Sequence, residues 1–185
     1  MHGRIGVGAA LLLCVIGVLG AAAASAAADP ALEPFFGEYV GRSIQAPNEQ
    51  LSPRDLSITI SRRDDNGFTL VWTTVIHDAA GARRQSYSVH FLPSARAGIF
   101  SSAMRHDIFG HAEPLDPLKG EPYVWADIHG PTLRVHALLI ADDGGYEIQV
   151  YRRTLTSDGM TLQFSRNRNG RELKTIYGAL TRKAG

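Results

Sequence analysis

The sequence predicts an all-β protein, an antiparallel up-and-down β-barrel of about eight to ten strands. Three observations predict this class. From Phe35 onward apolar residues recur with a period of two, and turn residues such as Asn-Gly and Gly-Pro separate the apolar runs. No segment has an apolar stripe at helical spacing over more than two turns.

The segment RDLSITISRR shows the strand pattern most clearly. Leu56, Ile58 and Ile60 alternate with polar residues, which predicts a strand with one buried face and one solvent-exposed face. The Asn-Gly pair at 66–67 then predicts a tight hairpin turn, because both residues tolerate positive φ. Similar runs follow the same logic: FFGEYVGRSI, GFTLVWTTVIH, RQSYSVHFL, GIFSSAM, YVWADIH, TLRVHALLI, YEIQVYRRTL, TLQFSRNR and RELKTIYGALTRK.

Short connections between these runs predict that neighbours in sequence are neighbours in the sheet. Such a meander leaves two unpaired edges unless it closes, and closure gives a barrel that is solid or holds one small ligand. A two-sheet sandwich is the alternative, disfavoured because no long Greek-key crossover is evident. A membrane barrel is disfavoured because its lipid-facing band would be apolar. The strand faces predicted to be solvent-exposed instead carry Asp55, Arg84, Arg134, Glu147 and Lys174.

Residues 1–28 have the layout of a cleaved secretory signal peptide. A basic start (MHGR) precedes an apolar core and then small residues at A-x-A spacing (ASAAADP). We expect cleavage after Ala26 or Ala28, a single domain over residues 29–185, and a periplasmic or secreted location without an integral membrane span. An uncleaved anchor is the alternative, because about twenty apolar residues can span a bilayer.

Cysteine usage and charge narrow the function classes. Cys14 is the only cysteine, so the mature chain would have no disulfide or thiolate nucleophile. The 19 basic and 18 acidic residues nearly balance, which disfavours a nucleic-acid partner. The chain lacks G-x-S-x-G, H-E-x-x-H and Gly-rich phosphate motifs. We therefore assign no catalytic residue, no metal site and no cofactor.

One long connection, residues 104–122, is rich in polar residues and proline. His106 and His111 are five positions apart. At this spacing their side chains would point apart on a helix and to opposite faces on a strand. Three prolines stiffen the segment, which predicts a lid over the barrel opening with His106, Phe109 and His111 as lid residues. A polar loop without chemistry and a metal or catalytic site are the alternatives.

Large rings that recur along strand faces predict a ligand pocket, although rings also fill solid cores. Asp127 and Arg152 continue apolar faces and are expected near the barrel mouth, because a buried charge is costly unless it is paired. His90 and His136 are expected to face outward. The candidate ligand-binding residues are Trp72, Tyr87, Phe91, Tyr123, Trp125, Asp127 and Arg152.

The layout resembles the calycin-type barrels, the group that holds lipocalins, avidins and fatty-acid-binding proteins with small bacterial lipocalin-like relatives. FFGEYVG stands where a Gly-x-Trp strand opens a lipocalin, with Tyr39 in place of tryptophan. ALTRK stands where the closing strand carries a basic residue. The resemblance implies a barrel with a cavity and names no ligand.

These observations favour an exported barrel that holds a small apolar or amphipathic molecule without transforming it. The first alternative is an envelope interaction or inhibitor protein that has a solid core and binds a protein partner through its outer surface. The second alternative is an enzyme that uses the cavity.

Overall fold

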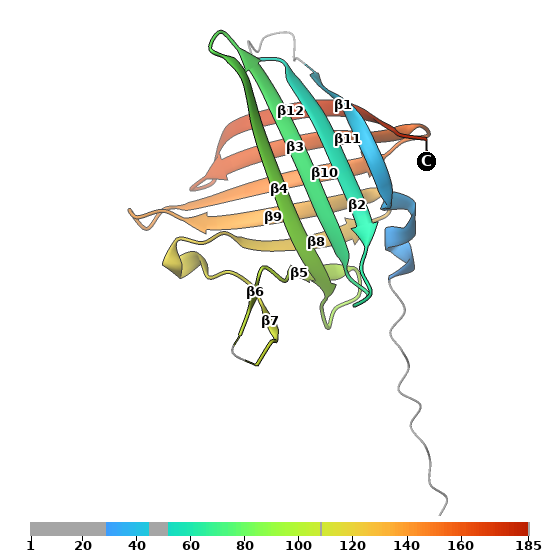
Figure 1. The fold of residues 1–185 in the computed structure, drawn as a ribbon. Coiled ribbons are helices and arrows are strands. Elements are labelled where there is room, and N and C mark those ends of the chain that lie inside the picture. The colour runs from blue at the N-terminus through green and yellow to red at the C-terminus, as the bar shows by residue number, and fades with distance from the viewer. Residues whose placement is uncertain (1–28, 45–51, 108, 185) are drawn as a thin grey trace, which may run out of the picture.

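The computed structural model describes residues 29–44, 52–107 and 109–184. Within them, ten strands form a closed antiparallel barrel, which confirms the predicted fold (Figure 1). The strands are β1 (Gly37–Ile44), β2 (Arg54–Arg62), β3 (Phe68–Asp78), β4 (Gly81–Pro93), β5 (Ile99–Ser102), β8 (Tyr123–His129), β9 (Thr132–Ile140), β10 (Tyr146–Leu155), β11 (Gly159–Arg168) and β12 (Arg171–Arg182). The expected signal peptide and its cleavage positions lie outside the described residues.

Strands that follow one another in the chain pair with one another, as expected for a meander. The ring order is β1-β12-β11-β10-β9-β8-β5-β4-β3-β2. Two turns have the backbone that Asn-Gly pairs predict: Asn66 has φ 61° between β2 and β3, and Asn169 has φ 50° between β11 and β12. Among the described residues, no helix is both long and apolar enough to cross a bilayer.

β1 and β12 close the ring through a tight backbone contact. Tyr39 lies opposite Arg182, and Gly41 lies opposite Leu180. A Cβ atom at Gly41 would lie 1.9 Å from the carbonyl oxygen of Ala179, so this approach of the two strands requires glycine.

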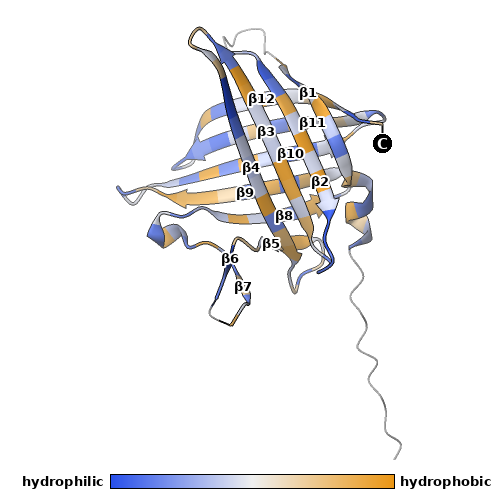
Figure 2. Cartoon of the chain, in the orientation of Figure 1, coloured by the Kyte–Doolittle hydropathy of each residue, from blue (hydrophilic) through white to orange (hydrophobic). Residues whose placement is uncertain are grey.

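One end of the barrel, which we call the closed end, is filled by side chains. The short 3-10 helix η1 (Pro30–Phe35) contributes Leu32 and Phe35 to the buried core. The Phe68 ring stacks on Phe91 at 4.8 Å and meets the Phe100 ring edge-on at 5.2 Å. In Figure 2, β4 changes from hydrophilic at its Gly81 end to hydrophobic at its Pro93 end, where this core lies. The closed end is therefore a solid core.

The opposite end of the barrel is open along one side. β5 has only four residues and pairs with β4 at Phe91–Pro93 alone. Within the described chain, the exposed part of β4 from Gly81 to Ser88 has no strand on the side away from β3. In Figure 1, β4 crosses in front of β9 and does not run alongside it. Closure was expected to remove the edges, but β5 is too short to cover this length of β4.

The connection between β5 and β8 forms an ordered appendage. β6 (Arg105–His106) pairs with β7 (Ala112–Glu113), and the 3-10 helix η2 (Pro117–Lys119) precedes β8. The Asp107 carboxylate accepts bonds from the backbone N–H groups of Phe109 and His111, both at 2.8 Å. Figure 1 shows this hairpin projecting away from the barrel next to β5.

Candidate functional site

The strand register determines which side chains point into the barrel, because directly opposed residues of an antiparallel pair share a face. Trp72 lies opposite the buried Ile58 on one side and opposite Tyr87 on the other. Tyr151 lies opposite the buried Val135 and opposite Phe164. These four rings, from β3, β4, β10 and β11, therefore point into the interior.

The four rings form a continuous array that crosses the barrel. Trp72 stacks on Tyr87 at 5.2 Å, and Tyr151 contacts Phe164 at 4.7 Å. Trp72 and Tyr151 meet at 5.5 Å, although their strands lie on opposite sides of the ring. All four rings border an open space in the barrel interior.

That space is a cavity of ≈ 320 Å³, which we call the hollow end. Its volume is near the lower limit for ligand pockets. Tyr87 is 50% exposed although it faces inward, because the cavity opens beside the unpaired length of β4. The lining residues are Arg54, Leu56, Ser57, Ile58, Trp72, Thr73, Thr74, Ile76, Gln85, Tyr87, Gln149, Tyr151, Arg153, Leu162, Phe164, Arg166, Lys174 and Ile176.

A buried guanidinium lies at the inner limit of this cavity. Arg153 is 1% exposed, and its Cζ lies 5.5 Å from the ring centroids of both Trp72 and Tyr151. Its Nε and Nη1 atoms have no hydrogen-bond partner among the described residues. Burial lowers the pKa of Arg153 to about 10, so the group is still a cation at neutral pH. Burial also raises the pKa of Tyr151 to about 12.

Three further basic residues line the cavity: Arg54, Arg166 and Lys174. Arg54 is mostly buried, and desolvation lowers its pKa. Arg166 donates to the Glu147 carboxylate at 2.7 Å. No described Asp, Glu or His lines the cavity, so its lining combines apolar, uncharged polar and basic side chains.

The structure places three of the predicted ligand-binding residues inside the barrel. Trp72 and Tyr87 line the hollow end, as expected. Phe91 also faces inward, but it is fully buried against Phe68 in the closed end and does not line the cavity.

The other four predicted residues, Tyr123, Trp125, Asp127 and Arg152, lie on the outer wall. Their neighbours in sequence, such as Ala126 and Arg153, are the inward-facing residues. The expectation that they line the interior is therefore wrong. β8 and β10 have apolar side chains on both faces, so alternation alone does not show which face turns inward. Sequence reasoning missed Tyr151 and Arg153 for this reason, and pairing to the regular β9 would have been the signal for them.

Asp127 and its neighbours form a polar cluster on the outer wall. The Asp127 carboxylate accepts a bond from Arg134 Nε at 2.5 Å and lies 2.8 Å from His136 Nε2. Trp125 stacks on His136 at 4.7 Å. Burial by these neighbours lowers the pKa of His136, although hydrogen bonding to Asp127 acts in the opposite direction. The expected outward direction of His136 is confirmed, but the ring is covered rather than solvated.

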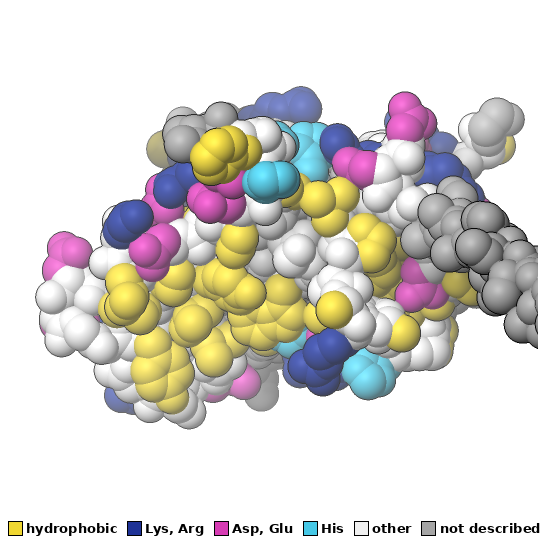
Figure 3. Space-filling view, turned by 90° about the horizontal axis from the view of Figure 1, so that it is seen from below, with side chains coloured by type: hydrophobic (Ala, Val, Ile, Leu, Met, Phe, Trp, Pro, Cys, Tyr) yellow, Lys and Arg dark blue, Asp and Glu magenta, His cyan; other side chains and the backbone are white. Residues whose placement is uncertain are grey.

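The outer wall of β8, β9 and β10 is also apolar beside this cluster. Tyr123 lies opposite Leu138, which in turn lies opposite Ile148. Figure 3 shows hydrophobic side chains gathered on one part of the face seen from below. Besides the cavity, this outer wall is therefore a surface where another molecule could make apolar contacts.

The predicted lid does not cover the cavity. His106, Phe109 and His111 are exposed on or beside the β6–β7 hairpin, next to β5, and none of them lines the hollow end. The lid prediction is wrong in its placement, because β5 pairs with β4 at the closed end and the connection leaves the barrel there. In the ranges that the structure describes, no three His, Cys, Asp or Glu side chains gather in a metal-binding arrangement.

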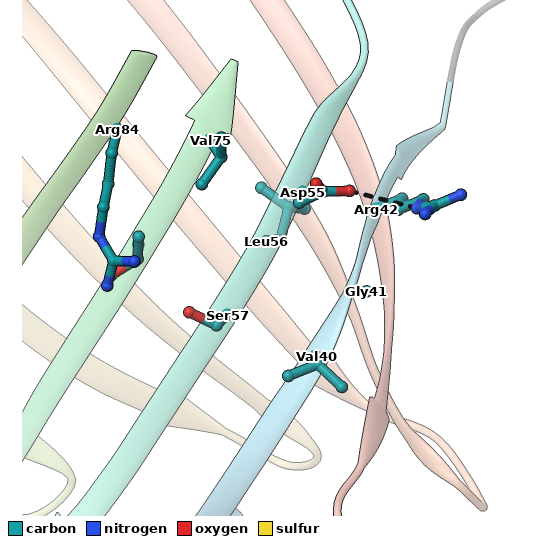
Figure 4. A pocket seen from close by; sticks show the side chains of 9 residues that line it. Val40, Gly41, Arg42, Asp55, Leu56, Ser57, Val75 and Arg84 are labelled. Carbon is teal, nitrogen blue, oxygen red and sulfur yellow. Dashed lines mark hydrogen bonds and ion pairs between the residues drawn. The ribbon is translucent and has the colours of Figure 1, made fainter. Parts of the chain in front are cut away.

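A wider groove of ≈ 520 Å³ crosses the outer surface of β1–β4 (Figure 4). Asp55 accepts from Arg42 Nε at 3.2 Å and lies 2.8 Å from His77 Nε2. These hydrogen bonds lower the pKa of Asp55, with the His77 bond as the largest cause. The charged groups at one end of the groove thus satisfy each other, and the groove is open to solvent. It offers a ligand less burial than the hollow end.

No protein-family model matches this chain, and no curated protein sequence matches it.

Proposed function

We propose that this protein is an exported barrel that holds one small, largely apolar or amphipathic molecule in its hollow end without transforming it. The observation that carries this proposal is the ring array, in which Trp72 and Tyr151 meet across the barrel and leave a cavity of ≈ 320 Å³ beyond them. A ligand there would gain roughly 25 cal/mol per Å² of apolar surface buried, before ordering costs.

The open side of the barrel supplies an entry path for such a ligand. β4 has no strand partner over Gly81–Ser88 on this side in the described chain, and the half-exposed Tyr87 lies on that stretch. A ligand can therefore reach the rings without displacing a backbone hydrogen bond of the barrel. The β6–β7 hairpin has no part in this path.

The cavity lining favours binding over chemistry. General acid–base catalysis commonly uses a His or carboxylate near the reacting atoms. The side chains described around the cavity are apolar, aromatic, amide, hydroxyl or basic. An enzyme that uses the cavity is therefore the weaker alternative.

Membership of the calycin-type barrels is part of this proposal. Its support is a contact between Tyr39 and one of the two basic residues of the segment ALTRK. Arg182 of the closing strand lies over the ring of Tyr39, with its Cζ 4.9 Å from the centroid. Arg182 also donates to the Phe36 carbonyl at 2.7 Å, so it joins the two ends of the barrel sheet.

Titration with N-phenyl-1-naphthylamine, a neutral apolar probe whose emission rises in dry surroundings, tests the proposal. Two substitutions at neighbouring positions of β3 serve as a matched pair. Thr74→Trp adds a ring in the cavity, whereas Val75→Trp adds one in the outer groove. We expect one probe per chain in the wild type and in Val75→Trp, with at least tenfold weaker binding to Thr74→Trp. Equal binding to both variants, or none to the wild type, would contradict the proposal.

A protein partner on the outer wall is the second candidate function. The apolar residues Tyr123, Leu138 and Ile148 favour it, since they lie on the outer face beside Trp125. Retention of a partner by Thr74→Trp and its loss from Leu138→Ser would support this candidate over the first.

A further inference from the structure

Arg153 is a buried cation for which the described chain supplies no counter-ion. Its side chain is 1% exposed, and two of its nitrogens, Nε and Nη1, lack a hydrogen-bond partner among the described residues. Buried charges in proteins are normally paired, and buried N–H groups normally donate. The Trp72 and Tyr151 rings attract the positive charge from 5.5 Å, but Nε and Nη1 still have no acceptor among the described residues.

The other charged residues that line the cavity do not compensate the charge of Arg153. Arg54, Arg166 and Lys174 line the same cavity, and no described carboxylate does. Glu147 lies near the open end, but it accepts from Arg166 and Gln149. Glu147 thus compensates the charge of Arg166, whereas no described carboxylate pairs with Arg153 or with the buried Arg54. Two buried guanidinium groups without a carboxylate partner are electrostatically complementary to an anion.

The order of residues along β10 shows where the anion would bind. The inward-facing residues run Glu147, Gln149, Tyr151, Arg153, from the hollow end toward the closed end. Arg153 is therefore the deepest polar group of this strand in the cavity, beyond the Tyr151 ring. An acidic group that reached it would be surrounded by rings and shielded from water.

We propose that the ligand is a small anionic amphiphile, whose carboxylate or sulfonate-type group binds Arg153 while its apolar body lies against the ring array. This proposal rests on the proposed function, because it names the chemical class of the molecule held in the hollow end. Charge-assisted hydrogen bonds from a guanidinium to acid oxygens are stronger than neutral ones. The cavity volume of ≈ 320 Å³ limits the class to small molecules.

Two probes with the same ring skeleton test the inference. 8-Anilinonaphthalene-1-sulfonate carries an acidic group, and N-phenyl-1-naphthylamine is its counterpart without one. We expect the wild type to bind the sulfonate at least tenfold more tightly. Arg153→Met should lose at least tenfold in affinity for the sulfonate and keep its affinity for the neutral probe. Arg152→Met, at the neighbouring outward-facing position, should leave both affinities unchanged.

Each failure has a separate meaning. If the wild type binds both probes equally, or if Arg153→Met weakens both alike, the anion inference is overturned and the proposed function stands. If neither probe binds the wild type, both are overturned. If Arg153→Met does not fold, Arg153→Lys replaces it in the test. This variant keeps the positive charge but changes the positions of the N–H donors. A more than threefold loss of sulfonate affinity with unchanged neutral binding would then support the inference, and equal binding of the sulfonate would overturn it.

Discussion

The Trp72 ring on β3 lies 5.5 Å from the Tyr151 ring on β10, on the opposite side of the barrel. Two walls that share no backbone hydrogen bond thus contact each other through side chains in the middle of the interior. The solid core lies on one side of this contact and the cavity on the other. The interior is neither a solid core nor an empty tube, and the two halves should respond differently to substitution.

Removal of a ring should destabilise the closed end far more than the hollow end. Phe68 is fully buried between Phe91 and Phe100, so we expect Phe68→Ala to lower the free energy of unfolding by about 3–5 kcal/mol. Tyr87 is 50% exposed beside the cavity, and Tyr87→Ala should cost less than about 1.5 kcal/mol. Urea unfolding curves measure both values. Similar losses in the two variants would show that the hollow end is as well packed as the closed end.

Replacement of the buried cation should stabilise the ligand-free protein. Burial lowers the pKa of Arg153 to about 10, which means that the folded state disfavours its charged form. An apolar side chain of similar size removes this cost, so Arg153→Met should raise the free energy of unfolding at pH 7 by about 1–3 kcal/mol. Arg152→Met, on the outer face, should change it by less than about 0.5 kcal/mol. Chemical denaturation compares the two, and a destabilised Arg153→Met would indicate that Arg153 is satisfied within the fold.

His136 should titrate below its ordinary pKa, because burial opposes its charged form more strongly than Asp127 favours it. Between its folded pKa and the unfolded value near 6.5, the unfolded chain binds more protons. This group therefore lowers the free energy of unfolding as the pH falls through that range. Asp127→Asn should lower the pKa of His136 further, as followed by the NMR signal of its ring. If the pKa of His136 were unchanged or higher in Asp127→Asn, the Asp127 carboxylate would not stabilise the charged form of His136.

Barrel closure should depend on glycine at position 41. A Cβ there would lie 1.9 Å from the Ala179 carbonyl oxygen, and both atoms belong to backbone-paired strands that cannot move apart freely. We expect Gly41→Ala to cost about 2–3 kcal/mol in thermal or chemical unfolding. Gly145→Ala is a milder comparison, since the nearest atoms there belong to the side chains of Asp143 and Asn169, at 3.0 Å or more. Equal stability of the two variants would contradict this account of closure.

The sequence was sufficient for the strands, the turns and the antiparallel order, because these depend on local alternation and on residues such as Asn66 that tolerate positive φ. It was not sufficient to assign the faces of β8 and β10. Both faces of these two strands have apolar residues. Only the register with β9 shows that Ala126 and Arg153 point inward while Trp125 and Arg152 point outward.

The misplaced lid has a comparable cause. The prolines between residues 114 and 122 do indicate an ordered connection, and Asp107 and Asp116 cap its turns. Its position depends on β5, which forms a local hairpin with the Pro93 end of β4 through only three residue pairs. The run GIFSSAM predicted a strand but did not show that it would end after four residues, and this early end leaves the connection at the closed end of the barrel.

The most direct test of the central claim uses the two tryptophans of the chain, Trp72 inside the barrel and Trp125 on its outer wall. Their indole N–H signals in a ¹H–¹⁵N correlation spectrum are assigned with Trp125→Phe and followed during titration with N-phenyl-1-naphthylamine. A cavity that holds ligands predicts that the Trp72 signal shifts and saturates at one probe per chain while the Trp125 signal stays in place. A shift of Trp125 with Trp72 unmoved would contradict it and assign the binding surface to the outer wall.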